Sequence, residues 1–228
     1  MIKRSFILPG ILITLTFAGL VSLGFWQLDR ADEKQAIVDA IVLAQSTPTK
    51  PLELENINSK EHYKVLLNGY FDSDKQFIYD NQIVKSNAGY YVLTPFILNN
   101  DSAILVNRGF VPWYGKRDEL IDIAIDGHPR TIEIGLIRPQ KRIQLKKQDV
   151  DTNFPILIQS LDLDQFSLLS GYQFVPMLAQ LDVNASNGFF RQWKPFYGSV
   201  DKHLGYAFQW FFMAFVLFII SLKILRKE

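Results

Sequence analysis

Two long stretches without any charged residue, one near each end of the chain, most constrain how this protein can fold. They cover 5–28 and 204–222 of the 228 residues. Because a helix rises about 1.5 Å per residue, they would extend over roughly 36 Å and roughly 28 Å, and the hydrocarbon core of a bilayer is about 30 Å thick. Both stretches are therefore predicted to be transmembrane helices, with residues 29–203 forming a domain between them.

The charges that flank the two stretches predict the direction in which they cross. Lys3 and Arg4 precede the first, and Lys223, Arg226 and Lys227 follow the second, whereas the segment between them holds more acidic than basic residues. Positive residues favour the cytoplasmic side of a membrane. We therefore expect a multi-pass protein with both termini in the cytoplasm. No Arg/Ser-rich transit peptide precedes the first stretch, which favours a bacterial inner membrane with a periplasmic main domain.

A cleaved signal peptide is the alternative for the first stretch, since such a peptide also begins with positive charges. The h-region of a signal peptide is only about 7–15 residues long, and a small-residue cleavage site follows it. The stretch 5–28 is longer than that, and no clean A-x-A site follows. An uncleaved anchor is the favoured interpretation.

Composition excludes several kinds of chemistry. The chain has no cysteine, which rules out disulfides, thiolate metal sites and thiol redox catalysis. Its three histidines, His62, His128 and His203, lack the helical spacing of a two-histidine zinc site. A formal net charge of +1 gives no reason to expect nucleic-acid binding. Neither a G-x-S-x-G serine nor a Gly-rich phosphate loop occurs, so the chain is not expected to be an enzyme.

The pattern between the two stretches changes from helical to strand-like. Over 29–45, apolar residues keep a helical spacing, which predicts that the first helix continues outside the membrane. From 62 to 183, short runs rich in β-branched and aromatic residues alternate with turn formers. Strands are expected over 62–71, 75–83, 89–98, 103–111, 131–138, 154–161 and 173–181. A short helix is expected over 162–169, with Asp162 or Asp164 as its N-cap and Gly171 as its stop.

Many closely spaced strands without long helices between them favour an antiparallel sheet that curls into a barrel or a sandwich. The expected fold class is thus membrane α plus β. Two transmembrane helices, N- and C-terminal, would flank an antiparallel β-rich, barrel- or sandwich-like extracytoplasmic domain with short helices.

The first candidate site lies at the outer start of the second stretch. On a helix, His203, Tyr206 and Trp210 share one face with Ala207. A neutral imidazole there could bind a metal or a haem iron, and the aromatic faces beside a small alanine leave room for a flat macrocycle. The alternative is an interfacial histidine beside an aromatic belt.

The second candidate lies at the outer end of the first stretch, where Trp26 and Arg30 share a helix face at i and i+4. Arg30 could bind a haem propionate or a lipid phosphate through paired N–H donors. The alternative is a membrane anchor, with Trp26 at the interface and Arg30 reaching to the headgroups. Because the expected topology brings both outer ends to one membrane face, Arg30 and His203 could form one pocket between the helices.

A third candidate lies at the end of an expected strand, within 106–112. Gly109 permits a close backbone approach or a β-bulge. Arg108 could pair with a partner protein or with a ligand carboxylate. The alternative is an arginine that holds the strand end to a carboxylate of its own domain.

The motifs of the chain, taken in order, resemble those of the surfeit locus protein 1 family, which assists the assembly of cytochrome c oxidase. They are Gly24-x-Trp26-Gln27-x-x-Arg30, Gly69-Tyr70-Phe71, Gly89-Tyr90 with Thr94-Pro95, Val106-Asn107-Arg108-Gly109-Phe110-Val111-Pro112 and His203-Leu204-Gly205-Tyr206-Ala207-x-Gln209-Trp210-Phe211. Each motif is short, but their order and their placement relative to two terminal spans are specific. The resemblance covers nearly the whole chain, with Phe110 where the family often has Trp.

The resemblance implies a membrane-anchored assembly factor rather than a catalyst. Bacterial members of the family are thought to hold haem a for insertion into oxidase subunit I, and His203 matches the expected iron ligand. By position, Trp26, Gln27 and Arg30 would line or support the pocket beside Tyr206 and Trp210. Arg108 and Gly109 would serve partner binding by the outer domain.

The implied partners are oxidase subunit I, the machinery that makes haem a, and membrane lipid. Two alternatives stay open: a scaffold that binds oxidase subunits without haem, and a membrane-tethered periplasmic hydrolase.

Overall fold

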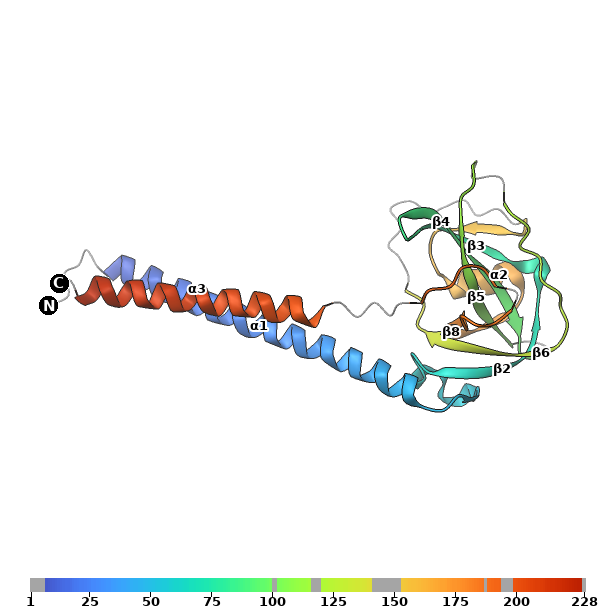
Figure 1. Cartoon of the computed structure of the whole chain (residues 1–228), viewed down its shortest axis with the longest axis horizontal. Helices are drawn as coiled ribbons and strands as arrows, with labels where there is room; N and C mark the ends of the chain where they lie inside the picture. Colours follow the sequence, from blue (N-terminus) through green and yellow to red (C-terminus); the bar gives the residue numbers. More distant parts are fainter. Residues whose placement is uncertain are drawn as a thin grey trace. The chain divides into compact units, whose positions relative to one another are not determined.

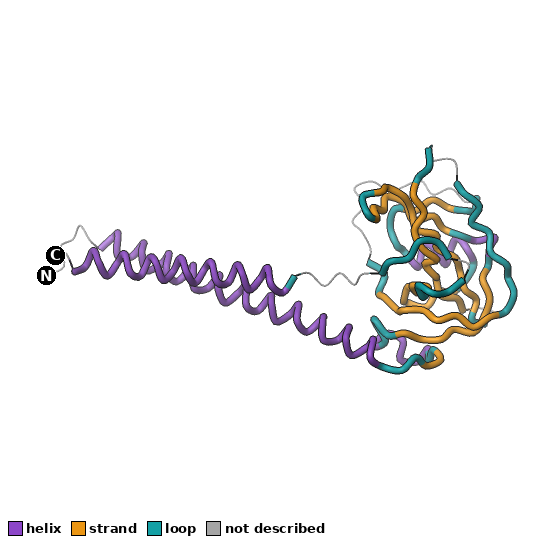
Figure 2. Tube along the Cα trace, in the orientation of Figure 1, coloured by secondary structure: helices purple, strands orange, loops and turns teal. Residues whose placement is uncertain are grey.

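The structure is a computed structural model, and its described parts form two compact units, a helical one and a β-rich one (Figures 1 and 2). The helical unit is Met1–Ala40 with Pro195–Glu228, and the β-rich unit is Ile41–Lys194. The residues described are 7–99, 102–115, 120–140, 153–186, 188–193 and 199–226. Of the charges that led to the topology prediction, Lys3, Arg4 and Lys227 lie outside the described residues.

The helical unit consists of α1 (Ile7–Ser46) and α3 (Val200–Arg226), although the last turns of α1 belong to the β-rich unit. α1 continues without a break past residue 28, since no Gly or Pro interrupts 25–47. Both helices are long and apolar enough to cross a membrane. Only 6% and 11% of their most apolar windows is buried in protein, so they are not core helices of a soluble fold. This supports membrane anchoring.

α1 and α3 lie side by side and run antiparallel. Phe17 meets Phe218 at a ring-centroid distance of 6.3 Å, and Phe25 meets Phe211 edge-on at 5.3 Å. Gly24 makes this approach possible, because a Cβ there would lie 2.5 Å from the Phe211 ring. The N-terminal part of α1 therefore lies beside the C-terminal part of α3.

The β-rich unit is a five-stranded barrel with extra strands. In the described residues, the strands are β1 (Lys50–Pro51), β2 (Lys64–Phe71), β3 (Phe77–Val84), β4 (Asn87–Ile97), β5 (Ser102–Pro112), β6 (Arg130–Ile137), β7 (Ile156–Ile158) and β8 (Gln173–Leu181). The barrel order is β2-β6-β8-β5-β4, and a pairing between β2 and β4 closes it. β3 and β7 extend the sheet from β4, and β1 adds to β2. The fold class expected from the sequence, two terminal helices flanking a barrel-like β domain, is confirmed.

Three strand pairings differ from a purely antiparallel sheet. β1–β2, β3–β7 and β5–β8 are parallel, whereas the other pairings of the described sheet are antiparallel. Parallel neighbours need a long crossover connection. The chain supplies it, because β6, β7 and the helix α2 (Leu163–Ser170) all lie between β5 and β8 in the sequence.

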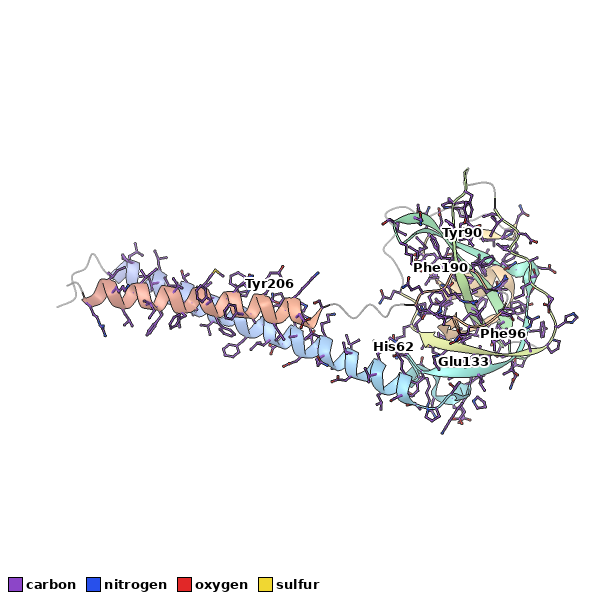
Figure 3. All side chains as sticks on the ribbon, viewed as in Figure 1. His62, Tyr90, Phe96, Glu133, Phe190 and Tyr206 are labelled. Atoms are coloured by element: carbon purple, nitrogen blue, oxygen red, sulfur yellow. The ribbon has the colours of Figure 1, made fainter. Side chains whose placement is uncertain are left out.

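Side chains that alternate in direction along each strand fill the interior of the barrel. On β2, Val65 and Leu67 point inward while Lys64 and Asn68 face solvent, and β6 shows the same period of two. β4 and β5 are buried on both faces over most of their length, since a second core packs on their other side. Phe96, labelled in Figure 3, lies in the barrel core.

The short helices are set by local hydrogen bonds. α2 begins where the Asp162 carboxylate accepts the Gln165 N–H at 3.4 Å, and it ends where the Gly171 N–H donates to Ser167. Two 3₁₀ helices, η2 (Leu54–Ser59) and η3 (Ser73–Lys75), complete the described elements.

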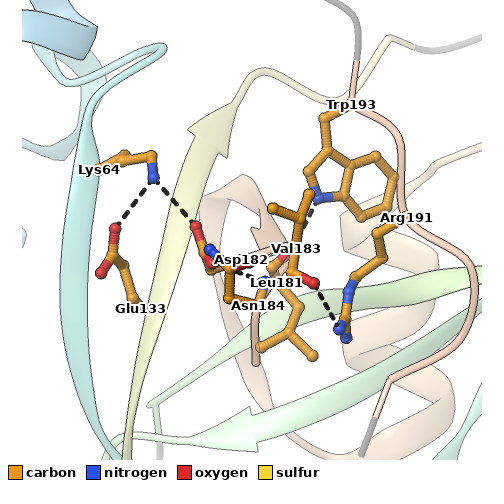
Figure 4. A network of polar contacts seen from close by, with 8 residues as sticks. All are labelled: Lys64, Glu133, Leu181, Asp182, Val183, Asn184, Arg191 and Trp193. Carbon is orange, nitrogen blue, oxygen red and sulfur yellow. Dashed lines mark hydrogen bonds and ion pairs between the residues drawn. The ribbon is translucent and has the colours of Figure 1, made fainter. Parts of the chain in front are cut away.

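A polar network ties together β2, β6 and the chain that follows β8 (Figure 4). The Lys64 ammonium lies 3.1 Å from Glu133 and 3.0 Å from Asp182. The Trp193 indole N–H donates to the Leu181 carbonyl at 2.7 Å. These contacts fasten the last described residues of the β-rich unit to its barrel.

Candidate functional site

His203 lies in the first turn of α3, directly before the uncharged stretch begins. The Ser199 hydroxyl accepts the Lys202 N–H at 3.3 Å and so caps the helix directly before the histidine. The ring is half-buried, and its Nδ1 lies 2.8 Å from Oε1 of Gln27 on α1. Among the described residues, its Nε2 makes no hydrogen bond. One ring nitrogen is therefore held across the hairpin and the other stays available.

Several residues form the contact between the helices at this end, and we call four of them the helix seam: Gly24, Gln27, Ala207 and Phe211. Ala207 is 2% exposed and Gln27 is 9% exposed, so both lie between the helices. Small residues at two of the four positions let the helix backbones come close. The close packing in the helix seam thus brings α1 and α3 near enough for the Gln27 side chain to contact His203.

The two aromatic residues predicted to lie beside His203 differ in solvent exposure. Tyr206, labelled in Figure 3, is 51% exposed, and Trp210 is half-buried. Ala207, which shares their helix face by spacing, points into the seam instead. The structure therefore leaves Tyr206 beside His203 on the outer surface of α3 and does not enclose it.

Arg30 lies one turn beyond Gln27 on α1, but its guanidinium contacts residues of its own helix. It forms an ion pair with Glu33 at 2.7 Å and lies over the Trp26 ring at 5.7 Å from the centroid. Its side chain is 45% exposed, so this ion pair contributes little stability. The structure brings Gln27 and His203 into contact and gives Arg30 a carboxylate partner that the sequence interpretation missed. The i, i+3 spacing of Arg30 and Glu33 was the available signal.

The donor set around His203 decides which metal species it could bind. In the described part of the chain, no group of three or more His, Asp and Glu side chains could hold a metal ion. A single imidazole is a poor site for a bare ion, but it suffices as an axial ligand where a porphyrin supplies the other four nitrogens.

Arg108 is the extra residue of a β-bulge and is buried. The pairing shifts by one residue between Val92 and Leu93, so that Arg108 has no partner residue on β4. Its guanidinium donates to the Ile123 carbonyl at 2.7 Å and to the Gln76 amide oxygen at 3.1 Å. Only 2% of the residue is exposed. Arg108 therefore joins β5 to Gln76, which directly precedes β3, and to the segment around residue 123.

The electrostatic surroundings of Arg108 are unusual for an arginine. Burial is the main cause that lowers its pKa to about 10, and the positive charges of Arg130 and Arg191 lower it further. Asp122 opposes them and raises the pKa. Such a buried cation is held in place by hydrogen-bond acceptors, and it does not present a charge on the surface.

Gly109 completes the bulge. Its N–H donates to the Asn107 side chain at 3.0 Å, and its φ is +127°. A Cβ at this position would lie 2.8 Å from the backbone of Phe189, which runs alongside. A partner-binding role for Arg108 and Gly109 stays a prediction, and in this geometry it would act through the loops that they hold.

A comparison with known protein families finds a match over most of the chain. The model of the SURF1 family matches residues 14–215, which include both the helix seam and Arg108. The chain belongs to the SURF1 family.

Relatives of this SURF1 protein occur in bacteria and in a eukaryote. A SURF1-like protein of Rickettsia bellii is 29% identical over 91% of this chain and 87% of its own length. One from Rickettsia conorii is 29% identical over 95% of this chain and 90% of its own. A SURF1-like protein of Dictyostelium discoideum is 23% identical over 90% and 92%.

The SURF1 family is known for oxidase assembly factors, and the names of these relatives do not point to an enzyme. The structure also describes the other two histidines of this SURF1 protein. His62 lies 4.0 Å from Glu61, and His128 is exposed in a turn.

Proposed function

We propose that this SURF1 protein is a membrane-anchored assembly factor that holds haem a for insertion into subunit I of cytochrome c oxidase. The observation that carries the proposal is the His203 imidazole at the end of the helix hairpin. Its Nδ1 is occupied by Gln27 at 2.8 Å, while Nε2 has no partner among the described residues.

The chemistry of haem a suits such a position. Haem a is amphipathic, with a long isoprenoid tail and two propionates. At a lipid–water boundary the tail stays in lipid and the propionates stay in the polar layer. His203 would supply one axial nitrogen, and the exposed ring of Tyr206 offers an apolar surface beside it. Arg30 could give a propionate the paired donors that it now gives Glu33.

The cargo has to be released as well as bound. A single axial ligand in a half-buried position gives modest affinity, and modest affinity permits transfer. An enclosed cage with two ligands would bind more tightly and release more slowly. The open surroundings of Tyr206 therefore fit a carrier better than a permanent haem protein.

Membrane topology is part of the proposal. Lys223 and Arg226 lie in the last turn of α3, at the end of the hairpin where Phe17 meets Phe218. By the positive-inside rule this end faces the cytoplasm, so both helices cross a bacterial inner membrane and the β-rich unit is periplasmic. That unit would bind oxidase subunit I and the proteins that make haem a, and the helices would contact lipid.

Complementation of a deletion strain tests the assembly role. Without the protein, we expect oxidase to contain less haem a per subunit I, and the wild-type protein should restore it. His203→Ala should reach the membrane in normal amount and fail to restore haem, whereas His128→Ala, which changes an exposed histidine, should restore it fully. Normal haem content in the deletion strain would contradict an assembly role. Full restoration by His203→Ala would favour the haem-free scaffold.

A further inference from the structure

Gln27 is a polar side chain in an apolar contact. It is 9% exposed, and its neighbours in the helix seam are Gly24, Ala207 and Phe211. Burying an amide costs free energy unless its polar atoms find partners. Among the described residues, the partner of this amide is the His203 ring at 2.8 Å. The position thus favours a side chain that can bind an imidazole.

The tautomer of the imidazole depends on which atom of the Gln27 amide faces it, and here that atom is Oε1. An amide oxygen accepts hydrogen bonds and cannot donate them, so a neutral His203 facing Gln27 Oε1 must carry its proton on Nδ1. Nε2 then keeps its lone pair. An imidazole in the other tautomer would carry its proton on Nε2, where that proton would block a bond to iron.

We propose that Gln27 is a positioning residue, which fixes the tautomer and the orientation of His203 so that Nε2 presents its lone pair. The role of that lone pair as an iron ligand rests on the proposed function, but the tautomer is a property of the protein without haem. Partners of this kind orient metal-binding histidines and make their nitrogen more basic.

The fold brings these two side chains together from distant parts of the sequence. Gln27 and His203 are 176 positions apart in sequence and come from different helices. Gly24 lies one turn before Gln27, and its lack of a side chain lets the Phe211 ring pack against α1. The hairpin must therefore form before the histidine is oriented, which couples the ligand geometry to the packing of α1 on α3.

Nitrogen NMR of the haem-free protein tests the tautomer directly. The full chain, labelled with ¹⁵N-histidine and held in detergent micelles, is measured at a pH where the imidazole is neutral. We expect His203 to show a protonated Nδ1 and an unprotonated Nε2. In Gln27→Leu the two tautomers should mix. A wild-type His203 with its proton on Nε2 would overturn the proposal.

Haem binding provides the second readout. Gln27→Leu should bind haem a more weakly by roughly 10–100-fold. Gln27→Glu keeps an acceptor, so it should retain binding and lower the reduction potential of the bound haem. Gln35→Leu is the matched control, because Gln35 lies on the same helix, is exposed and bonds Asp39 of its own helix at 2.8 Å.

The outcomes separate this inference from the proposed function. Equal haem affinity of wild type and Gln27→Leu would overturn the positioning role and leave the haem-carrier function intact. A wild-type protein that has the Nδ1-protonated ring but binds no haem a would support the tautomer assignment and overturn the carrier function.

Discussion

Single glycines decide where this chain can bend or approach itself. At Gly109 the backbone has φ +127°, a conformation that residues with a Cβ adopt only with strain. The Phe189 backbone also occupies the space into which a Cβ would project, at 2.8 Å. The β-bulge that turns Arg108 into the interior depends on both conditions.

We expect Gly109→Ala to destabilise the β-rich unit by roughly 2–3 kcal/mol, from backbone strain together with the contact to Phe189. Gly135→Ala is the control, because Gly135 lies within β6 and a Cβ there meets nothing within 4 Å. Denaturant unfolding of the purified protein, followed by tryptophan fluorescence, measures the difference. Equal midpoints for the two variants would contradict the account of the bulge.

Local signals at the residue scale were readable from the sequence, and contacts between distant residues were not. Asp162 and Gly171 mark the ends of α2 because caps depend on neighbouring residues. The bond between Gln27 and His203 spans 176 positions, and no local pattern encodes it. The resemblance to a family brought Gln27 to attention, but the structure supplied its partner.

At the scale of elements, α1 and α3 pack through small residues. Gly24 and Ala207 sit where the two helices approach, and Phe211 fills the space that Gly24 leaves. In a membrane, lipid is as apolar as a leucine side chain, so close packing contributes most to helix association.

Gly24→Leu should therefore push the Phe211 ring away and loosen the hairpin. Cysteines introduced at Phe17 and Phe218 report on it, since the natural chain contains no cysteine and those rings lie 6.3 Å apart. We expect thiol crosslinking in membranes to fall several-fold. Gly19→Leu is the matched control, because a side chain at Gly19 meets nothing within 4 Å. Unchanged crosslinking in Gly24→Leu would contradict the claim that close packing at Gly24 holds α1 and α3 together.

The ion pairs of Lys64 give the β-rich unit a pH dependence. Burial alone would raise the pKa of the Asp182 carboxyl, but the Asn184 backbone N–H and then the Lys64 ammonium outweigh it and lower that pKa below its usual value. A carboxyl with a lowered folded-state pKa stabilises the fold above the pKa of the unfolded chain. That stability is lost as the pH falls through the folded-state pKa.

Asp182→Asn should lower the free energy of unfolding by about 1–2 kcal/mol at neutral pH, and the loss should shrink toward pH 3. Urea unfolding at a series of pH values measures this. Asp164→Asn, which changes an exposed carboxylate on α2, should leave the pH profile as it is. A constant difference between wild type and Asp182→Asn across that range would show that the ion pair does not carry the effect.

The alternation on β2 and β6 explains why the strands of the barrel could be predicted. Their burial pattern has a period of two, which the sequence shows directly. The parallel pairing of β5 with β8 could not be predicted, since it depends on how far the chain travels between them. The direction of Arg108 depends on the bulge between Val92 and Leu93, which only the register reveals.

At the scale of the whole molecule, the order of elements was the most readable feature. Charge-free stretches at both ends and a β-rich middle predict an anchored domain, and the SURF1 match over 14–215 covers the whole middle and most of both stretches. The division of labour follows from their chemistry. In the proposed function, the helices would hold the histidine at a membrane boundary, and the β-rich unit would offer folded surface to protein partners.

The absorption spectrum of the full-length protein, purified in detergent from cells able to make haem a, tests the central claim most directly. We predict a Soret band for the wild type and for His128→Ala, and its loss in His203→Ala. A colourless wild-type protein, or a His203→Ala protein with full haem occupancy, would contradict the claim that this helix hairpin carries haem a on His203.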